Sequence, residues 1–139
     1  MKKEKFFKKW TKYIIEGKMD SDKVAKIVLY NDKNEVLFLK RTDYVEKFKK
    51  EWDLPGGHAH IGEDIIKALR REVREETKLS FKKPVKIKKI GNITFFKAKY
   101  DGGEIKLSKE HSEFLFRDVK KIKNPTKFEK VAKKAIKND

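Results

Sequence analysis

Apolar residues in this sequence form short runs in some segments and alternate with polar residues in others, and both patterns predict strands. Residues 24–30 and 36–39 are short apolar runs that predict two strands, with the turn-forming residues 31–34 between them. Residues 40–51 are mixed and charged, which predicts a loop. From residue 84 to residue 100, apolar residues partly alternate with lysines, as is typical of half-buried strands.

The sheet is expected to continue beyond residue 100. Residues 101–104, Asp-Gly-Gly-Glu, predict a hairpin turn. Residues 105–107 and 114–116 would then supply further strands of the same sheet.

Helical spacing of apolar residues predicts three helices. One covers residues 63–77, and a second covers residues 2–15, where an aromatic stripe lies among lysines. Asn124 followed by Pro125 predicts the start of a C-terminal packing helix. The order of elements predicts an α+β fold or an α/β/α sandwich with a mixed β-sheet. We expect a basic, helical extension over residues 1–20 and a single domain over residues 21–139.

Composition and charge limit the classes of protein that this chain can represent. It has 139 residues, of which 37% are hydrophobic and 43% charged, and it has no cysteine, so disulfides and thiolate metal sites are excluded. No apolar run is long enough to span a membrane and no secretory signal is visible, which predicts an intracellular, cytoplasmic protein. The net charge of +16 favours polyanionic partners such as nucleotides, RNA or an anionic membrane surface. The same charge could serve only solubility.

The helix predicted over residues 63–77 carries acids on its apolar side. At about 100° per residue, Glu72 and Glu76 project with the apolar arc one turn apart, and Glu75 lies at its edge. Like charges at this spacing destabilise a helix by roughly 0.2–0.5 kcal/mol, and burying an unpaired carboxylate costs more. A sequence that keeps both features is expected to bind a cation at this position.

The segment that contains these acids resembles the Nudix box, G-x5-E-x7-R-E-U-x-E-E-x-G-U, in which U is aliphatic. The matching residues are Gly57, Glu63, Arg71, Glu72, Val73, Glu75, Glu76 and Leu79. Lys78 departs from the pattern because it replaces the last glycine, which commonly ends a helix in the left-handed conformation. Either Lys78 adopts that conformation at a cost of roughly 1–2 kcal/mol, or the helix ends in another way. The resemblance covers residues 22–137.

What the resemblance implies is a Nudix fold and Mg²⁺- or Mn²⁺-dependent hydrolysis of a nucleoside diphosphate linked to another moiety. It implies that the metal ligands come from a set of five glutamates and one backbone carbonyl: Glu63, Glu72, Glu75, Glu76, Glu110 and Gly56. From the helical spacing, Glu75 would be a third ligand or would be held by Arg71, which precedes it by one turn. Glu63 could join the ligands or support them. The general base would be Glu72 or Glu110, with Glu110 favoured over Glu113 in the later loop.

Other residues have both a functional and a structural interpretation. Arg41 and Gly57 could bind substrate phosphate, although Arg41 could equally be a surface residue. His58 and His60 could ligate a softer metal such as Zn²⁺, but are expected to be solvent-exposed loop residues. The aromatic candidates for stacking a base, most of which are expected to be core residues, are Trp52, Phe95, Phe96 and Tyr100.

Several functions remain open at the level of sequence. The enzyme could remove damaged nucleotides or process RNA 5′ ends, and the basic charge modestly favours larger anions. A non-catalytic module that binds nucleotide or RNA is the alternative, although such a module would be expected to have lost one of Glu72, Glu75 or Glu76. A homodimer is possible, but nothing in the sequence locates its interface.

Overall fold

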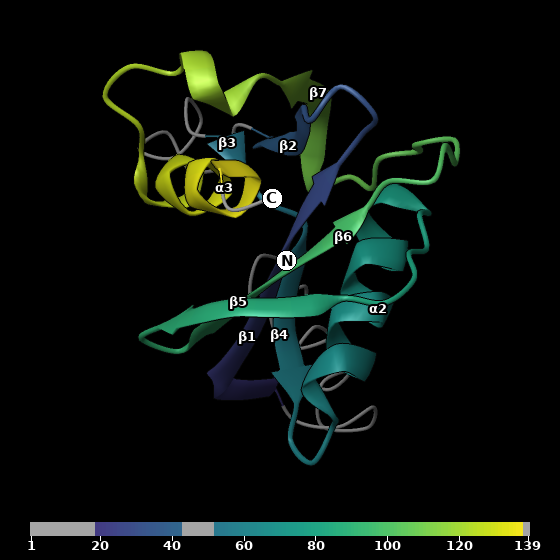
Figure 1. Ribbon diagram of the computed structural model, residues 1–139. Helices are drawn as coiled ribbons and strands as arrows, with labels where there is room; N and C mark the ends of the chain where they lie inside the picture. Colours follow the sequence, from purple (N-terminus) through teal and green to yellow (C-terminus); the bar gives the residue numbers. More distant parts are fainter. Residues whose placement is uncertain (1–18, 43–51, 138–139) are drawn as a thin grey trace.

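The computed structural model describes residues 19–42 and 52–137. The helix expected over residues 2–15 and most of the loop expected over residues 40–51 lie outside the described residues. Within them, seven strands form one mixed sheet that two α-helices and a 3₁₀ helix accompany (Figure 1). In chain order the elements are β1 (Met19–Tyr30), β2 (Val36–Arg41), β3 (Trp52–Asp53), β4 (Gly56–His60), α2 (Ile65–Thr77), β5 (Val85–Ile90), β6 (Ile93–Lys99), β7 (His111–Arg117), η2 (Val119–Lys121) and α3 (Lys127–Lys137).

The centre of the sheet is opened by the segment that contains β3 and β4. The path of the sheet is β3-β2-β1-β6-β5, with β4 paired to β1 and β7 paired to β2. β1 is parallel to β6 and antiparallel to β4, but it meets β2 only at the pair Tyr30 and Val36. Pro55, between β3 and β4, accepts a hydrogen bond from the Ile27 amide at 2.9 Å. The glycines that follow Pro55 are therefore held at the middle of the sheet.

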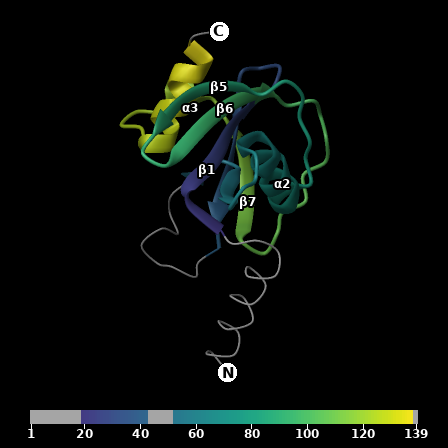
Figure 2. The same ribbon diagram turned by 90° about the horizontal axis from the view of Figure 1, so that it is seen from below.

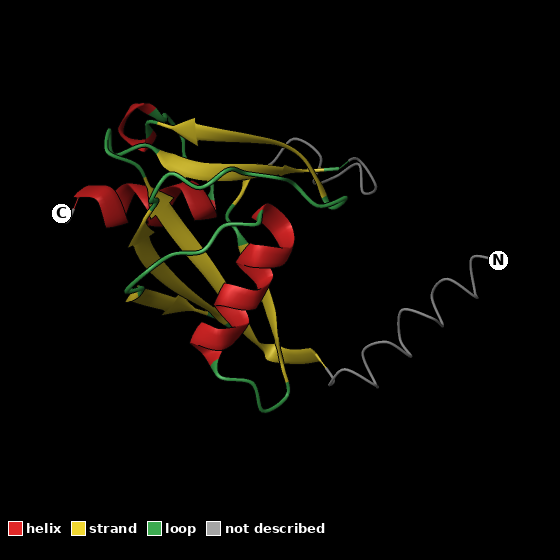
Figure 3. Ribbon diagram, turned by 90° about the vertical axis from the view of Figure 1, so that its right-hand side faces the viewer, coloured by secondary structure: helices red, strands yellow, loops and turns green. Residues whose placement is uncertain are grey.

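The two faces of the sheet are covered by different helices (Figures 2 and 3). In β1, Ala25, Ile27 and Leu29 pack toward α2, whereas Val28 packs toward α3. This alternation is the period of two that a strand imposes on its side chains. The predicted α/β/α arrangement is confirmed, because each face of the sheet has its own fully buried apolar cluster. Among the described residues, neither helix has the length and apolar character needed to cross a membrane.

Helix α2 begins and ends through identifiable caps. Asp64 is the N-cap, and its carboxylate accepts hydrogen bonds from the amides of Ile66 and Lys67 at 3.1 Å each. Lys78 ends the helix with φ 65°, and its amide donates to the carbonyl of Arg74. The predicted helix is confirmed, with its start at Ile65 rather than residue 63. Lys78 takes the left-handed conformation that the replaced glycine would have adopted.

Replacing Lys78 with glycine should therefore stabilise the protein. Relief of the left-handed strain is worth roughly 1–2 kcal/mol, and the greater freedom of glycine in the unfolded chain offsets about 0.4–1 kcal/mol of that gain. We expect Lys78→Gly to raise the free energy of unfolding in urea by about 0.5–1 kcal/mol. Lys82→Gly is the matched control, because Lys82 is exposed and lies outside the left-handed region. Equal effects of the two substitutions would show that Lys78 carries no strain.

The C-terminal helix starts later than predicted. Asn124 has φ 53° and lies outside the helix, which begins at Lys127. Thr126 and Glu129 form a capping box in which the Thr126 amide donates to Glu129 at 2.8 Å and the Glu129 amide donates back to the Thr126 hydroxyl at 3.4 Å. The Asn-Pro signal was thus wrong about the start of this helix, because the Thr-x-x-Glu signal two residues later satisfies the free amides.

The hairpin predicted over residues 101–104 and the strand predicted over residues 105–107 are both wrong. Residues 101–108 contain no strand, and the turn that joins β5 to β6 lies at Gly91 and Asn92. The segment instead lies beside the end of α2, where the amides of Lys106 and Ser108 donate to the carbonyls of Thr77 and Glu76 at 3.0 Å each. Carbonyls at a helix C-terminus lack partners within the helix, and this loop supplies them. Residues 114–116 do form a strand, within β7.

Candidate active site

A cleft of about 800 Å³ opens where β4, α2, the loop before β7 and the start of α3 converge. This volume is within the usual range for sites that bind small ligands. The lining residues that carry charge or hydrogen-bonding groups include Lys26, Arg41, Asp53, His58, His60, Arg71, Glu72, Glu75, Glu76, Glu110 and Lys127. The cleft therefore contains most of the residues that the sequence singled out.

The three acids of α2 enter the cleft to different depths. The Glu76 side chain is 6% exposed, that of Glu72 is 20% exposed and that of Glu75 is 59% exposed. The prediction that Glu72 and Glu76 project with the apolar side of α2, with Glu75 at its edge, is confirmed. Burial raises the pKa of Glu72, and the nearby charges of Glu75 and Glu110 add to this effect while Arg71 opposes it. A cation placed among these carboxylates would relieve that repulsion.

Glu76 is the most deeply buried acid of the cleft. Its Oε1 accepts a hydrogen bond from the Gly56 amide at 2.7 Å. Burial raises its pKa to about 8, although the charge of Lys26 and the Gly56 hydrogen bond act in the opposite direction. A carboxylate in this position is strongly favoured to bind a positive partner when it is ionised.

Arg71 binds three of the four glutamates of the motif: Glu63, Glu72 and Glu75. Its Nε and Nη2 donate to the two oxygens of Glu63 at 3.0 Å each, and Nη1 donates to Glu72 at 3.0 Å and to Glu75 at 3.3 Å. Nη2 also donates to the His58 carbonyl at 3.1 Å. The sequence prediction that Arg71 holds Glu75 agrees with these contacts. One guanidinium thus fixes the spacing between the end of β4 and the first turns of α2.

Glu63 does not line the cleft, unlike the other acids of the motif. Its two oxygens accept from Arg71, and Oε1 also accepts from the His60 amide at 2.9 Å. The bond to Arg71 is the largest cause that lowers the pKa of Glu63 to about 2, although partial burial acts against it. Of the two roles left open by the sequence, the contacts favour support of the ligands over direct metal binding.

Gly56 is required because the backbone of β1 leaves no space for a side chain, whereas a side chain at Gly57 would require only the Glu72 side chain to move. Gly56 has φ 129°, and a Cβ there would lie 2.0 Å from the Ala25 carbonyl oxygen. A Cβ on Gly57 would lie 2.5 Å from Glu72 Oε2. The Gly56 carbonyl, a proposed metal ligand, also accepts a hydrogen bond from Lys26 at 3.2 Å. These glycines allow β4 to lie directly against β1 on one side and α2 on the other.

A buried ion pair lies under the cleft. Lys26 Nζ donates to Asp53 Oδ1 at 3.0 Å and Oδ2 at 3.2 Å, and to the Leu54 carbonyl at 3.1 Å. Burial alone would raise the pKa of Asp53, but Lys26 and His111 together hold it below its ordinary value. The pair therefore places a fixed positive charge and a fixed negative charge beneath the carboxylates of α2.

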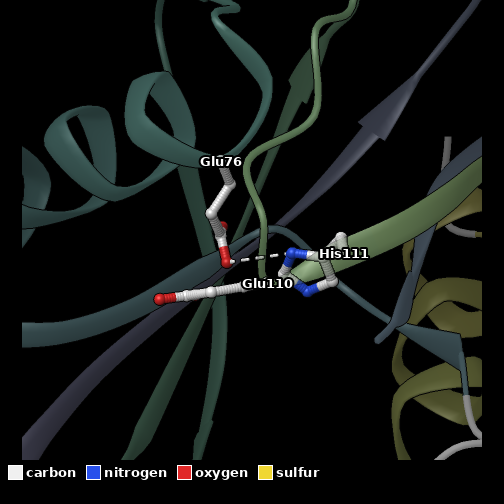
Figure 4. A group of neighbouring side chains, drawn as sticks. All are labelled: Glu76, Glu110 and His111. Carbon is white, nitrogen blue, oxygen red and sulfur yellow. Dashed lines mark ion pairs between the residues drawn. The ribbon is translucent and has the colours of Figure 1, made fainter. Parts of the chain in front are cut away.

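The loop before β7 brings a fourth acid, Glu110, to the same place, and the first residue of β7 is a histidine, His111 (Figure 4). The backbone of Glu110 is held by Thr42, whose amide donates to the Glu110 carbonyl at 3.0 Å. Glu110 is exposed, whereas His111 is buried. Glu76, Glu110 and His111 each offer one ligand atom within 4.8 Å of the others. Glu110, predicted from the sequence to approach the metal, thus lies with the acids of α2.

The remaining predicted residues divide between cleft and core. Arg41 lines the cleft, with its side chain 56% exposed and its Nε 3.9 Å from Asp53 Oδ2. Trp52 also lines the cleft. The other proposed stacking residues do not: Phe95 and Phe96 are buried in the two core clusters, and Tyr100 packs on Phe116 with ring centroids 4.9 Å apart.

His58 and His60 were wrongly predicted to be solvent-exposed loop residues. Both are half-buried in β4 and line the cleft. The reason is the antiparallel pairing of β4 with β1, which extends as far as His60 opposite Met19. Burial is the largest cause that lowers the pKa of His58, with the charge of Lys26 in the same direction.

Several residues that line the cleft were not identified as functional from the sequence, among them Lys26, Asp53, Lys127 and Phe128, and the buried His111 next to the cleft was also missed. Lys26 gave a signal, because it is a lone charge inside an otherwise apolar strand. Asp53 and His111 are far apart in the sequence, and only the pairing of β2 with both β3 and β7 brings them together. Phe128 was assigned to the core as part of the α3 pattern, and it also forms part of the cleft wall.

Comparison with known proteins gives a consistent result. The sequence profile described as the NUDIX domain matches residues 20–136. The fold is similar to the MutT protein from Methanosarcina mazei Go1, which is 24% identical over 83% of this chain and 92% of that chain, with a TM-score of 0.64. The Caenorhabditis elegans Ap4A hydrolase (22%, 81% and 95%, TM-score 0.63) and the MutT NUDIX hydrolase from Burkholderia pseudomallei (19%, 78% and 92%, TM-score 0.60) share the fold. A search of curated proteins found no match.

Proposed function

Because the chain belongs to the Nudix family of hydrolases, we propose that it cleaves the pyrophosphate bond of a nucleoside diphosphate linked to another moiety, with Mg²⁺ or Mn²⁺ as cofactor. The observation that carries this proposal is the convergence of Glu72, Glu76 and Glu110 on one cleft, with Glu75 at its rim. Without a cation, such a group of acids would repel a diphosphate.

The donor set fits a hard divalent cation. Carboxylate oxygens are the ligands that Mg²⁺ and Mn²⁺ prefer, and the Glu72 and Glu76 side chains come from successive turns of one rigid helix. We propose that Glu72, Glu76 and Glu110 hold the metal, with help from Glu75 and the Gly56 carbonyl. Glu63 would act through Arg71.

Different residues of the chain would then carry out different parts of the hydrolysis. When bound, the metal would neutralise charge on the phosphate oxygens and so favour attack on phosphorus. Attack by water forms a new P–O bond and breaks the bridging P–O bond, and a carboxylate must accept the proton that the water loses. Glu72 and Glu110 both line the cleft, and we propose that one of them accepts this proton. Arg41 and Lys127, both exposed at the cleft, can bind the outer phosphates.

The substrate is proposed from the size and charge of the cleft. A volume of about 800 Å³ accommodates a nucleoside diphosphate. The fold is shared with MutT proteins and with an Ap4A hydrolase, whose name states a nucleotide substrate, and this supports a nucleotide substrate here. The net charge of +16 keeps RNA 5′ ends as a second substrate class.

The experiment is a hydrolysis screen. Nucleoside diphosphate derivatives and capped RNA would be incubated with the protein and Mg²⁺ or Mn²⁺, and released phosphate or pyrophosphate measured. We expect hydrolysis of at least one compound, and none in EDTA. Tight nucleotide binding without hydrolysis under any of these conditions would favour the non-catalytic module instead.

A further inference from the structure

His111 is a buried histidine whose ring nitrogens lack partners. Its side chain is 2% exposed at the start of β7. Among the described residues, neither Nδ1 nor Nε2 has a hydrogen-bond partner. Burying polar atoms in this way is unfavourable, and nearly all such atoms in folded proteins are satisfied. A bound metal ion would give one of these two ring nitrogens a partner.

The surroundings of Nδ1 are those of a metal ligand. It lies 3.9 Å from Glu76 Oε2, which is too far for a hydrogen bond. Two atoms that bind one ion at about 2.1 Å lie roughly 3–4 Å apart. Figure 4 shows the imidazole and the Glu76 carboxylate facing each other, with Glu110 beside them. The three ligand atoms lie within 4.8 Å of one another.

The second nitrogen faces a residue that could orient the ring. Nε2 lies 3.6 Å from Asp53 Oδ2, and Asp53 is fixed by its ion pair with Lys26 at 3.0 Å. Metal-binding histidines almost always donate their other N–H to a carboxylate, carbonyl or water. A small movement of the ring toward Asp53 would make that bond, and it would leave Nδ1 unprotonated and aimed at Glu76.

We propose that Glu76, Glu110 and His111 form a metal site in which His111 Nδ1 is a direct ligand, and that this site selects Mn²⁺ over Mg²⁺. The inference rests on the proposed function and deepens it, because Glu76 and Glu110 line the same cleft and the buried His111 lies beside them. Mg²⁺ strongly prefers oxygen ligands and retains its water. Mn²⁺ also prefers oxygen ligands, but as a first-row transition ion it accepts imidazole nitrogen more readily than Mg²⁺ does. A mixed nitrogen and oxygen set therefore favours Mn²⁺ over Mg²⁺.

The decisive test is pulsed electron paramagnetic resonance of Mn²⁺ bound to the full chain without substrate. Coupling of the Mn²⁺ electron spin to a ligand nitrogen is expected, and its pattern should change when the protein is labelled with ¹⁵N-histidine. The chain has three histidines, so the double variant His58→Gln/His60→Gln is the control and should keep the coupling. A Mn²⁺ complex of the wild-type protein without nitrogen coupling would overturn the inference.

Calorimetry with Mn²⁺ and with Mg²⁺ tests the selectivity independently. His111→Gln should weaken Mn²⁺ binding by at least the roughly 10–100-fold that loss of an outer-shell partner costs, and should change Mg²⁺ binding much less. Equal losses for the two ions would overturn the inference, since they would show a structural role. If the protein hydrolyses nucleotides with Mg²⁺ but shows no nitrogen coupling, this inference fails alone; if neither ion binds and nothing is hydrolysed, the proposed function fails with it.

Discussion

Replacing Glu76 with glutamine is expected to lower the turnover of a nucleoside diphosphate substrate by about three orders of magnitude without unfolding the protein. Glutamine keeps the shape of the side chain and an oxygen that can accept from the Gly56 amide, which lies 2.7 Å from Glu76 Oε1. It removes the charge that would bind the metal. Loss of roughly 4 kcal/mol of transition-state stabilisation corresponds to about 10³ in rate. Steady-state kinetics at saturating Mg²⁺ would measure the effect.

The same variant should be more stable than wild type in EDTA at neutral pH. Burial raises the pKa of Glu76 from 4.5 to about 8, so in this range the folded protein keeps a proton that the unfolded chain has released. The contribution of Glu76 to stability therefore falls as pH rises from about 4.5 to 8, whereas glutamine does not titrate. Urea denaturation should show almost no difference between the two proteins near pH 4 and a growing advantage for Glu76→Gln toward pH 8.

Glu104→Gln is the matched control for both measurements. Glu104 is exposed and lies in the loop after β6, outside the cleft lining. Its replacement should change neither turnover nor the pH dependence of stability. Wild-type turnover in Glu76→Gln would remove Glu76 from the metal ligands, and a loss of stability at pH 8 would show that the charged carboxylate stabilises the fold.

The sequence was sufficient to predict the features that depend on the periodicity of a single helix. The apolar arc of α2 is continuous over more than three turns, and the positions of Glu72 and Glu76 relative to it follow directly from 3.6 residues per turn. Arg71 lies four residues before Glu75, so their contact is also a property of one helix. These predictions required no knowledge of what the helix packs against.

The sequence was not sufficient to predict the features that depend on contacts between distant segments of the chain. Residues 101–108 have turn and strand character, but the unpaired carbonyls of Thr77 and Glu76 bind their amides instead. Likewise, nothing in the local sequence around Asp53 and His111 shows that β2 will lie between them. The proximity of Asp53 and His111 beneath the cleft is therefore a consequence of the sheet topology.

Replacing Gly56 with alanine is expected to destabilise the protein severely, because the backbone of β1 leaves no space for the added methyl group. The new Cβ would lie 2.0 Å from the Ala25 carbonyl oxygen and 2.8 Å from Lys26 Cα, and φ at this position is 129°. Backbone strain contributes about 1–3 kcal/mol, and forcing a methyl group into a packed region costs a similar amount. We expect the free energy of unfolding in urea to fall by roughly 3–5 kcal/mol.

Gly62→Ala separates the two causes, because Gly62 also has a positive φ, 80°, but no atom lies within 4 Å of its added Cβ. Strain alone should cost Gly62→Ala about 1–2 kcal/mol, and equal losses in the two variants would contradict the steric argument.

The clash at Gly56 is with the backbone of β1, so only separation of β4 from β1 can relieve it. That movement takes the Gly56 amide away from Glu76, and turnover should therefore fall together with stability in whatever fraction of Gly56→Ala still folds. A folded Gly56→Ala enzyme with wild-type turnover would show that the spacing of these two strands does not position Glu76.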